Sequence, residues 1–352
     1  MITKSFPKSK NLENGRFNDI AFIKTNMMIC VVLCHATAFF TGNWFSVFTP
    51  VYGAGYLASF SDFLGFFHIQ SFTMASGFLF YYLMLKKGRY DNPKKDIKKR
   101  AQRLLVPYLF TSVLWAIPIG AMFFNYSWGD IINKYVLMTG PAQLWFLIML
   151  FIVFVFFVLI GKKIKLSFRN LVLVYIVTTT IGSLLSMAHL NYFQIPISVR
   201  YILFFYLGGY IYKNRKAISW KQTIMMTLMA VGLYALVACL GNSDKNIIKY
   251  GINFIEPLIS LLAVSVIYFL CNRLVLKNGG IVRNRFYRLL EDNSFGIYLF
   301  HQQIIYFTIV WFNGLVHPIL QAVLSFVIAT CVSLAMSVIL KKWRLTRTMF
   351  GL

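Results

Sequence analysis

The stretch LWFLIMLFIVFVFFVLI, residues 144–160, has no charged side chain, and its only side-chain nitrogen or oxygen is the indole nitrogen of Trp145. An α-helix needs about 20 mostly apolar residues to cross the hydrocarbon core of a bilayer, which is about 30 Å thick. Exposing so long an apolar run to water is unfavourable, because the cost grows with the apolar area. We therefore predict a membrane-spanning helix over residues 143–160.

Nine further stretches have the same character. They cover residues 20–41, 63–85, 104–124, 171–190, 199–212, 221–240, 252–271, 294–313 and 319–340. The chain has 352 residues, of which 59% are hydrophobic and only 13% are charged. Soluble proteins are about 45–50% apolar and about 25% charged, so the composition argues against a soluble fold. We expect an all-α fold, a polytopic integral membrane bundle of about ten transmembrane helices over 20–340, with tails at 1–19 and 341–352.

The distribution of Lys and Arg predicts the orientation of the bundle. The chain has 35 of them against 10 Asp and Glu, and 30 of the 35 lie in alternate connections. These connections are residues 1–19, 86–103, 161–170, 213–221, 272–293 and 341–352. The opposite connections hold only Lys134, Lys245 and Lys249. Cytoplasmic loops carry the excess of Lys and Arg, so we expect both termini in the cytoplasm. Membrane topology also accounts for the net charge of +25, and we expect no nucleic-acid partner.

Two ionisable residues, Lys24 and His35, fall inside the first predicted span. An ionisable group at mid-depth costs at least a few kcal/mol, so each marks a candidate site. Their spacing brings both side chains to one helical face, about 16 Å apart along the axis. Alone, Lys24 fits an interfacial lysine, and His35 fits an interhelical hydrogen bond. Together they indicate a lined pathway, where the cation holds phosphates and the imidazole takes a proton from a hydroxyl.

A pair of arginines stands at the start of the third span. The connection 86–103 carries nine Lys or Arg residues and ends with Arg100 and Arg103. A spacing of three places both guanidinium groups on one helical face. Guanidinium groups suit phosphate, which they can bind through two parallel hydrogen bonds. Anchoring by lipid headgroups is the alternative explanation, and the sequence leaves both open.

The ninth span carries a polar stripe. Asn293 is a suitable N-cap for this helix, and Ser294, Tyr298 and His301 follow at the spacing of one helical face. We predict that Tyr298 and His301 contact the substrate.

Three other residues are candidate substrate contacts. His68 lies toward the outer end of the second span, and Glu256 is the one acid placed well inside a span. Trp145 opens the fourth span, where an interfacial aromatic is the simpler explanation. The five cysteines lie inside or beside apolar stretches and form no CxxC pair, so we expect neither a disulfide framework nor a metal site.

Six short motifs follow one another along the chain. They are Lys24 followed by ten residues and His35, Ser76-Gly77-Phe78, Arg100-x-x-Arg103 before Leu-Leu-Val-Pro-Tyr108, Leu144-Trp145-Phe146-Leu147, Phe205-Tyr-Leu-Gly208-Gly209-Tyr, and Ile297-Tyr298-Leu299-Phe300-His301. Each is weak by itself. In this order, and over most of the chain, they resemble the membrane-bound acyltransferase 3 family.

The resemblance implies a ten-helix membrane enzyme that moves an acyl group, usually acetyl, to a hydroxyl of a cell-surface glycan or glycan precursor. The donor co-substrate would be cytoplasmic acetyl-CoA or another acyl-CoA, the acceptor a glycan or glycolipid. By this likeness His35 would be catalytic, and Lys24, Arg100 and Arg103 would bind the donor. We expect a multi-pass protein of the cell membrane, in the first place the bacterial cytoplasmic membrane.

One departure from the family leaves the acceptor class open. Many members that modify polysaccharides carry a glutamate a few residues after the tryptophan of the fourth helix. Here the run continues through Met149 and Leu150 without an acid.

A transporter of a glycan or lipid-linked intermediate is the rival hypothesis, because polar residues would also line its passage. Many transporters contain inverted repeats and broken helices. Pro107, Pro118 and Pro196 interrupt the spans, but the second half of the chain does not echo the first. A lipid-binding or assembly subunit without chemistry is a third and weaker alternative.

Overall fold

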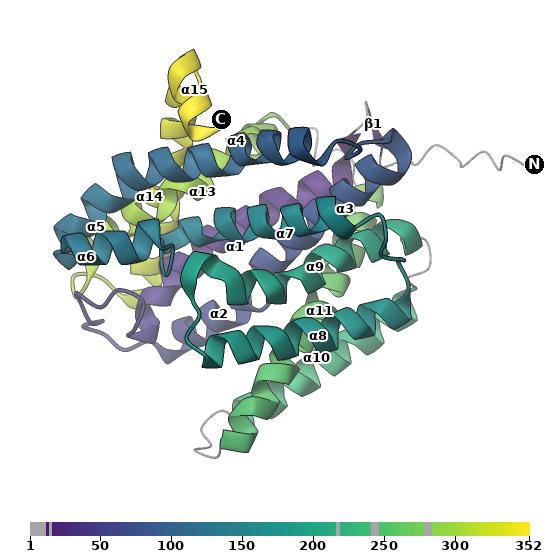
Figure 1. Cartoon of the computed structure of the whole chain (residues 1–352). Helices are drawn as coiled ribbons and strands as arrows, with labels where there is room; N and C mark the ends of the chain where they lie inside the picture. Colours follow the sequence, from purple (N-terminus) through teal and green to yellow (C-terminus); the bar gives the residue numbers. More distant parts are fainter. Residues whose placement is uncertain (1–11, 14–15, 216–218, 241–245, 278–283) are drawn as a thin grey trace, which may run out of the picture.

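The computed structural model describes residues 12–13, 16–215, 219–240, 246–277 and 284–352, and nearly all the regular structure there is helical. Figure 1 shows the long helices side by side in one bundle. Ten described segments are long and apolar enough to span a membrane, which confirms the predicted all-α polytopic fold. Most of the predicted tail 1–19, parts of the connections 213–221 and 272–293, and Lys245 lie outside the described residues.

The elements occur in the following order. The first half contains β1 (Leu12–Glu13), β2 (Arg16–Phe17), α1 (Asn18–Ala38), η1 (Phe39–Thr41), α2 (Gly55–Gly65), α3 (His68–Lys87), α4 (Pro93–Thr111), η2 (Ser112–Ala116), α5 (Ile117–Phe124), α6 (Trp128–Ile131) and η3 (Ile132–Val136). The second half contains η4 (Ala142–Leu144), α7 (Trp145–Ile160), α8 (Phe168–Met187), η5 (Tyr192–Gln194), α9 (Ile195–Asn214), α10 (Trp220–Leu240), α11 (Asn246–Lys277), α13 (Arg285–Phe312), α14 (Pro318–Leu340) and α15 (Arg344–Phe350). The two short strands pair with each other in antiparallel fashion.

The third span begins well before the predicted residue 104. Its helix, α4, starts at Pro93, because the side chain of Asn92 accepts a hydrogen bond from the Lys95 backbone N–H at 3.1 Å. Proline is favourable at the first position of a helix, where no backbone donor is needed. The cationic first half of α4 therefore continues directly into its apolar second half. Hydropathy in the sequence marks only the second half of this helix.

The predicted start of the ninth span is wrong. The helix α13 begins at Arg285, and its N-cap is Asn284, whose side chain accepts from the backbone of Phe286 and Tyr287. Asn293 lies inside the helix, where its amide donates to the Leu289 carbonyl oxygen and accepts from the Ser337 hydroxyl of α14. A neighbouring helix thus satisfies a polar side chain that looked like a cap.

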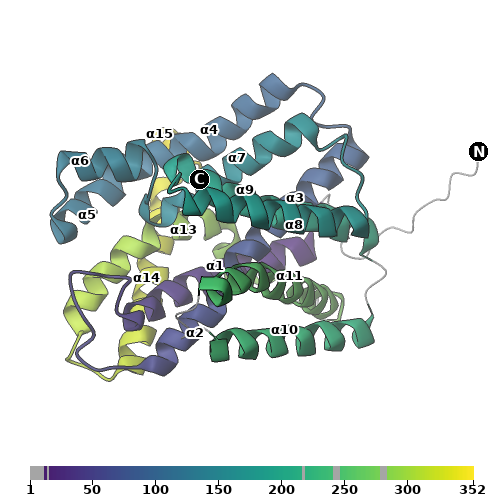
Figure 2. The same cartoon turned by 60° about the horizontal axis from the view of Figure 1, so that its bottom comes forward.

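The first helix lies in the interior of the bundle. It packs against α2, α3, α11, α13 and α14, and Figure 2 shows α1 among these helices. Ile23, Met28 and Val32 on α1 are fully buried. Lys24 and His35 of α1 are therefore held among protein side chains, with α3 and α13 as close neighbours.

Helices α3 and α9 approach each other very closely. A Cβ atom added at Gly77 would lie 2.0 Å from the Phe205 carbonyl oxygen, and one at Gly208 would lie 2.0 Å from the Met74 carbonyl oxygen. Only glycine permits this contact, which is the packing that small residues provide in membranes. The contact fixes α3, whose neighbouring residue Ser76 faces the site described next.

Candidate active site

A cavity of about 930 Å³ opens between α1, α3, α4, α7 and α13. Seven Lys or Arg side chains line it, together with three Asp or Glu side chains. Another part of its wall is apolar and aromatic, formed by Phe72, Phe146, Leu147 and the ring of Tyr298. We call it the cation-lined cavity. It can accept a ligand that is strongly anionic at one end and apolar at the other.

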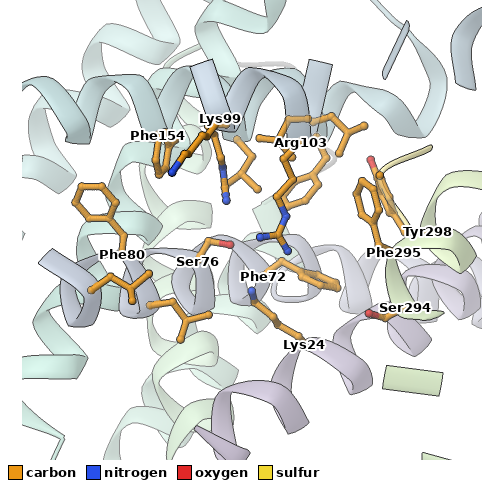
Figure 3. Close-up of a pocket in the computed structure, with 18 of the residues that line it drawn as sticks. Lys24, Phe72, Ser76, Phe80, Lys99, Arg103, Phe154, Ser294, Phe295 and Tyr298 are labelled. Carbon is orange, nitrogen blue, oxygen red and sulfur yellow. The ribbon is translucent and has the colours of Figure 1, made fainter. Parts of the chain in front are cut away.

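The structure places Lys24, Arg100 and Arg103 together in the wall of this cavity. In Figure 3, Arg103 from α4 and Lys24 from α1 reach into the same space from opposite sides. The guanidinium carbon of Arg100 lies 4.7 Å from the ring centroid of Phe154. Its buried Nε has no hydrogen-bond partner in the described part of the chain. This donor is available to an anion, because a guanidinium keeps its charge and its fork of N–H groups.

Tyr90 and Lys341 belong to the wall, lie outside the spanning segments and have shifted pKa values. Burial raises the pKa of Tyr90, in the connection between α3 and α4, although nearby guanidinium groups act against the shift. Tyr90 therefore stays a neutral phenol near pH 7, able to donate a hydrogen bond. Burial lowers the pKa of Lys341, and its ammonium donates to the Asp292 carbonyl oxygen.

Residues 351 and 352 supply a wall of the cavity that no sequence motif predicts. Gly351 and Leu352 line the cavity, and α15 packs against α4. Phe350 lies edge-on against Phe300, with ring centroids 5.3 Å apart. Gly351 has a φ of 65°, and a Cβ there would lie 2.7 Å from the ring of Pro107. The segment carries no motif and was assigned simply as a tail.

His35 lies deeper along α1 and pairs with His301 of α13. The His35 Nδ1 is 2.8 Å from the His301 Nε2, and the two rings are nearly parallel, with centroids 5.0 Å apart. The His301 Nδ1 lies 2.8 Å from the Tyr298 carbonyl oxygen and 3.0 Å from that of Ile297. His301 is fully buried, whereas His35 is partly exposed. We call these residues the histidine pair.

The histidine pair does not line the cation-lined cavity, although Lys24 and His35 share a helix. Tyr298 separates the two regions. Its ring belongs to the cavity wall, lies 5.7 Å from that of Phe146, and lies 6.2 Å from that of His301. The lined pathway expected from the sequence is therefore divided by one aromatic layer.

The other predicted substrate contacts lie in three different places. His68 is buried at the start of α3, with its Nδ1 2.6 Å from the Leu64 carbonyl oxygen, and a charge on it would act on both members of the histidine pair. Trp145 packs on Tyr201 and does not line the cavity. Glu256 on α11 is half-buried, and its charged neighbour is Arg200 of α9. The structure places the Tyr298 ring beside that of His301 and brings His68 close to the histidine pair, whereas Trp145 and Glu256 lie elsewhere.

Residues 17–341 match the model of a family described as an acyltransferase domain, the acyltransferase 3 family. The chain belongs to this family. No curated protein and no solved structure matches it. Since its described residues include ten helices apolar and long enough to span a membrane, the chain is a multi-pass membrane acyltransferase.

Two buried glutamines of this acyltransferase were missed from the sequence. Gln143 and Gln303 exchange amide hydrogen bonds of 2.8 and 3.0 Å, and the Gln143 amide also donates to the Leu299 carbonyl oxygen. The Tyr298 hydroxyl donates to the backbone carbonyl of Gln143. This network joins the start of α7 to α13 and holds the Tyr298 ring in place. The sequence does contain a signal for such a network, since His301-Gln302-Gln303 puts three polar residues in succession inside a span.

Trp44 is a further neighbour of the histidine pair. Its ring centroid lies 5.4 Å from that of His35. It follows η1 in a loop, and no sequence pattern related it to His35. Among the described residues, no group of three His, Cys, Asp or Glu side chains could hold a metal ion.

Proposed function

We propose that this acyltransferase moves an acyl group, in the first place acetyl, from cytoplasmic acyl-CoA to a hydroxyl of a cell-surface glycan or glycolipid precursor. The bacterial cytoplasmic membrane is the membrane proposed. The observation that carries the proposal is the cation-lined cavity, in which Lys24, Arg100 and Arg103 meet from two helices. Coenzyme A has the matching chemistry, because its phosphates need cations and its pantetheine arm is long and thin.

Donor binding follows from the two kinds of wall. The phosphates would rest on Arg100 and Arg103, whose guanidinium groups favour phosphate, with Lys24 as a further cation. The pantetheine arm and acyl group would lie along Phe72, Phe146 and Tyr298, where apolar surface is buried on binding. Phosphates cannot enter the hydrocarbon of the bilayer without such partners.

The transfer step needs a base near the thioester. The Nε2 of His35 would take the proton of the acceptor hydroxyl, and the hydroxyl oxygen would attack the thioester carbonyl carbon. A new C–O ester bond forms as the C–S bond breaks, and the proton passes to the departing thiolate. The products are an acyl ester and free coenzyme A.

Two positions of the substrates are implied. The thioester would reach His35 only when donor binding displaces the ring of Tyr298 and breaks its hydrogen bond to the Gln143 carbonyl oxygen, because that ring separates the cavity from the histidine pair. The acceptor hydroxyl approaches from the other direction, where the partly exposed His35 lies beside Trp44. This arrangement lets a cytoplasmic donor and an external acceptor meet inside the bundle.

The test uses purified protein in lipid vesicles that contain acyl-labelled acetyl-CoA, with glycan acceptors outside. We expect label on acceptor hydroxyls with wild-type protein, and a loss of about 10²–10⁴-fold with His35→Ala, the usual contribution of general acid–base catalysis. His189→Asn is the matched control, because His189 is exposed with a φ of 54° that asparagine tolerates. Movement of a glycan across the membrane without acyl transfer would favour the transporter.

A further inference from the structure

We propose that His301 is a positioning residue that fixes one tautomer of His35, with the proton on Nδ1 and the lone pair on Nε2. Its importance for catalysis rests on the proposed function of His35 as the base. The tautomer itself follows from contacts of the two rings alone. It therefore has its own test.

The contacts of His301 determine where its proton lies. Its Nδ1 is within hydrogen-bond distance of the carbonyl oxygens of Ile297 and Tyr298. A carbonyl oxygen only accepts hydrogen bonds, so this nitrogen must carry the N–H. A neutral imidazole has one N–H, and the uncharged form is the less costly one in a membrane interior. The Nε2 of His301 is consequently an acceptor.

The proton of His35 follows from that of His301. The His301 Nε2 is 2.8 Å from the His35 Nδ1, and an acceptor at that distance requires a donor. His35 therefore carries its N–H on Nδ1 and leaves its Nε2 unprotonated. The hydrogen bond of His35 to another described residue is made by its Nδ1, so its Nε2 has no partner among these residues, and the ring is partly exposed. The basic nitrogen is thus free for a substrate hydroxyl.

The orientation of the pair is fixed as well as its protons. His301 is bonded at both ring nitrogens, so its ring cannot rotate without losing a contact. Trp44 lies against His35, with ring centroids 5.4 Å apart. When His35 takes a proton, its Nδ1–H bond to His301 becomes charge-assisted and stronger. His301 therefore stabilises the charged form that the transfer step creates.

This assignment replaces the role predicted for His301 from the sequence. A substrate contact needs a ring nitrogen that is accessible and unoccupied. Both nitrogens of His301 are already hydrogen-bonded, and the side chain is fully buried. His301 acts through His35 and does not touch the substrate.

Nitrogen NMR of protein labelled with ¹⁵N in its histidine side chains tests the tautomer directly. The protein is held in lipid vesicles, and His35→Gln identifies the His35 signals by their loss. We expect a protonated Nδ1 and an unprotonated Nε2 for His35 in the wild type, and a mixture of tautomers in His301→Leu. A wild-type His35 with its proton on Nε2 would overturn the inference, whether or not the protein transfers acyl groups.

Kinetics test the catalytic consequence. His301→Leu removes the acceptor and should lower kcat by about 10²-fold, with the KM for acyl-CoA nearly unchanged. His301→Gln offers an amide oxygen to the His35 N–H and should recover about tenfold of that loss. Thr308→Val is the control, because it removes a buried hydrogen bond from α13 to Ser325 of α14 without touching the histidine pair. It should leave kcat near wild type.

The failures of the two proposals can be told apart. Full activity in well-folded His301→Leu would overturn the positioning role, as would equal losses in the Leu and Gln variants. Full activity in His35→Ala would instead overturn the proposed role of His35 as the base, while the NMR result for the tautomer would still stand.

Discussion

The cation-lined cavity and the histidine pair both contain residues of α1, but they differ in how completely their polar groups are hydrogen-bonded. In the cavity, the Nε of Arg100 has no hydrogen-bond partner within the described structure, and seven Lys or Arg side chains line the wall against three Asp or Glu side chains. In the histidine pair, three of the four ring nitrogens are hydrogen-bonded, and only the His35 Nε2 is left.

This difference indicates two roles, ligand binding for the cavity and positioning of a base for the histidine pair. A polar group left unpaired in a protein interior costs free energy, so the unpaired Arg100 Nε, in a wall with more cations than acids, is best explained by an anionic ligand that pairs with it. A fully bonded group has no capacity left for a ligand, but its geometry is well determined. The cavity is therefore suited to hold an anionic donor, and the histidine pair to present one base.

The largest expected effect is all-or-none and tests whether the two regions face the expected sides. In a cysteine-free background, Ser127→Cys should react with an impermeant reagent in intact cells, because the cation distribution puts residues 125–142 outside. Lys94→Cys, at the start of α4, should react only after the membrane is made permeable. The reverse pattern of labelling would invert the bundle and put the cation-lined cavity on the outer side.

The next effect concerns donor affinity. Arg100→Gln combined with Arg103→Gln should weaken acyl-CoA binding by about 10²-fold, because each charge-assisted hydrogen bond contributes about 1.5–3 kcal/mol. Equilibrium binding to purified protein in vesicles measures it. Lys94→Gln combined with Lys98→Gln is the matched control, since both are exposed on α4 and neither lines the cavity. Equal weakening in the two double variants would mean that the arginines contribute only general positive charge and do not bind the donor phosphates.

A smaller effect should follow from overpacking the close contact between α3 and α9, which fixes one wall of the cavity. Gly77→Ala places a Cβ 2.0 Å from the Phe205 carbonyl oxygen, and such overpacking costs about 1–3 kcal/mol. Gly232→Ala on α10 is the control, because nothing lies within 4 Å of its added Cβ, and alanine is favoured over glycine in a helix by about 0.5–1 kcal/mol. Thermal unfolding in the same detergent compares them. Equal stability of the two variants would contradict the close contact between α3 and α9.

The smallest effect concerns the aromatic layer between the two regions. Tyr298→Phe keeps the ring but removes the hydroxyl that donates to the Gln143 carbonyl oxygen. The free energy of unfolding should fall by about 1 kcal/mol, while acyl-CoA affinity stays near wild type. A loss of donor affinity with unchanged stability would instead make the hydroxyl part of the donor site.

The sequence predicted the features that depend on local pattern. Ten apolar runs gave ten spans, since span length follows from bilayer thickness. The spacing of Arg100 and Arg103 placed both on one face of α4, and the structure has both in the cavity wall. Both predictions require only the length and the periodicity of a single helix.

Features that depend on contacts between distant helices could not be predicted. His35 and His301 are 266 residues apart and meet only because α1 packs against α13. The Tyr298 ring divides the expected pathway because the network around Gln143 and Gln303 holds α13 against the start of α7. Asn293 was read as a cap because its partner, Ser337, belongs to another helix.

The most direct test of the account measures donor affinity and single-turnover acyl transfer on the same vesicles, for His35→Ala and for Arg100→Gln combined with Arg103→Gln. A thioether analogue of acetyl-CoA reports affinity without being consumed. The account predicts that His35→Ala keeps the affinity and loses about 10²–10⁴-fold in transfer, whereas the arginine variant loses affinity and recovers transfer at saturating donor. Loss of affinity in His35→Ala, or transfer in the arginine variant that stays low at saturation, would contradict the separation of binding from chemistry.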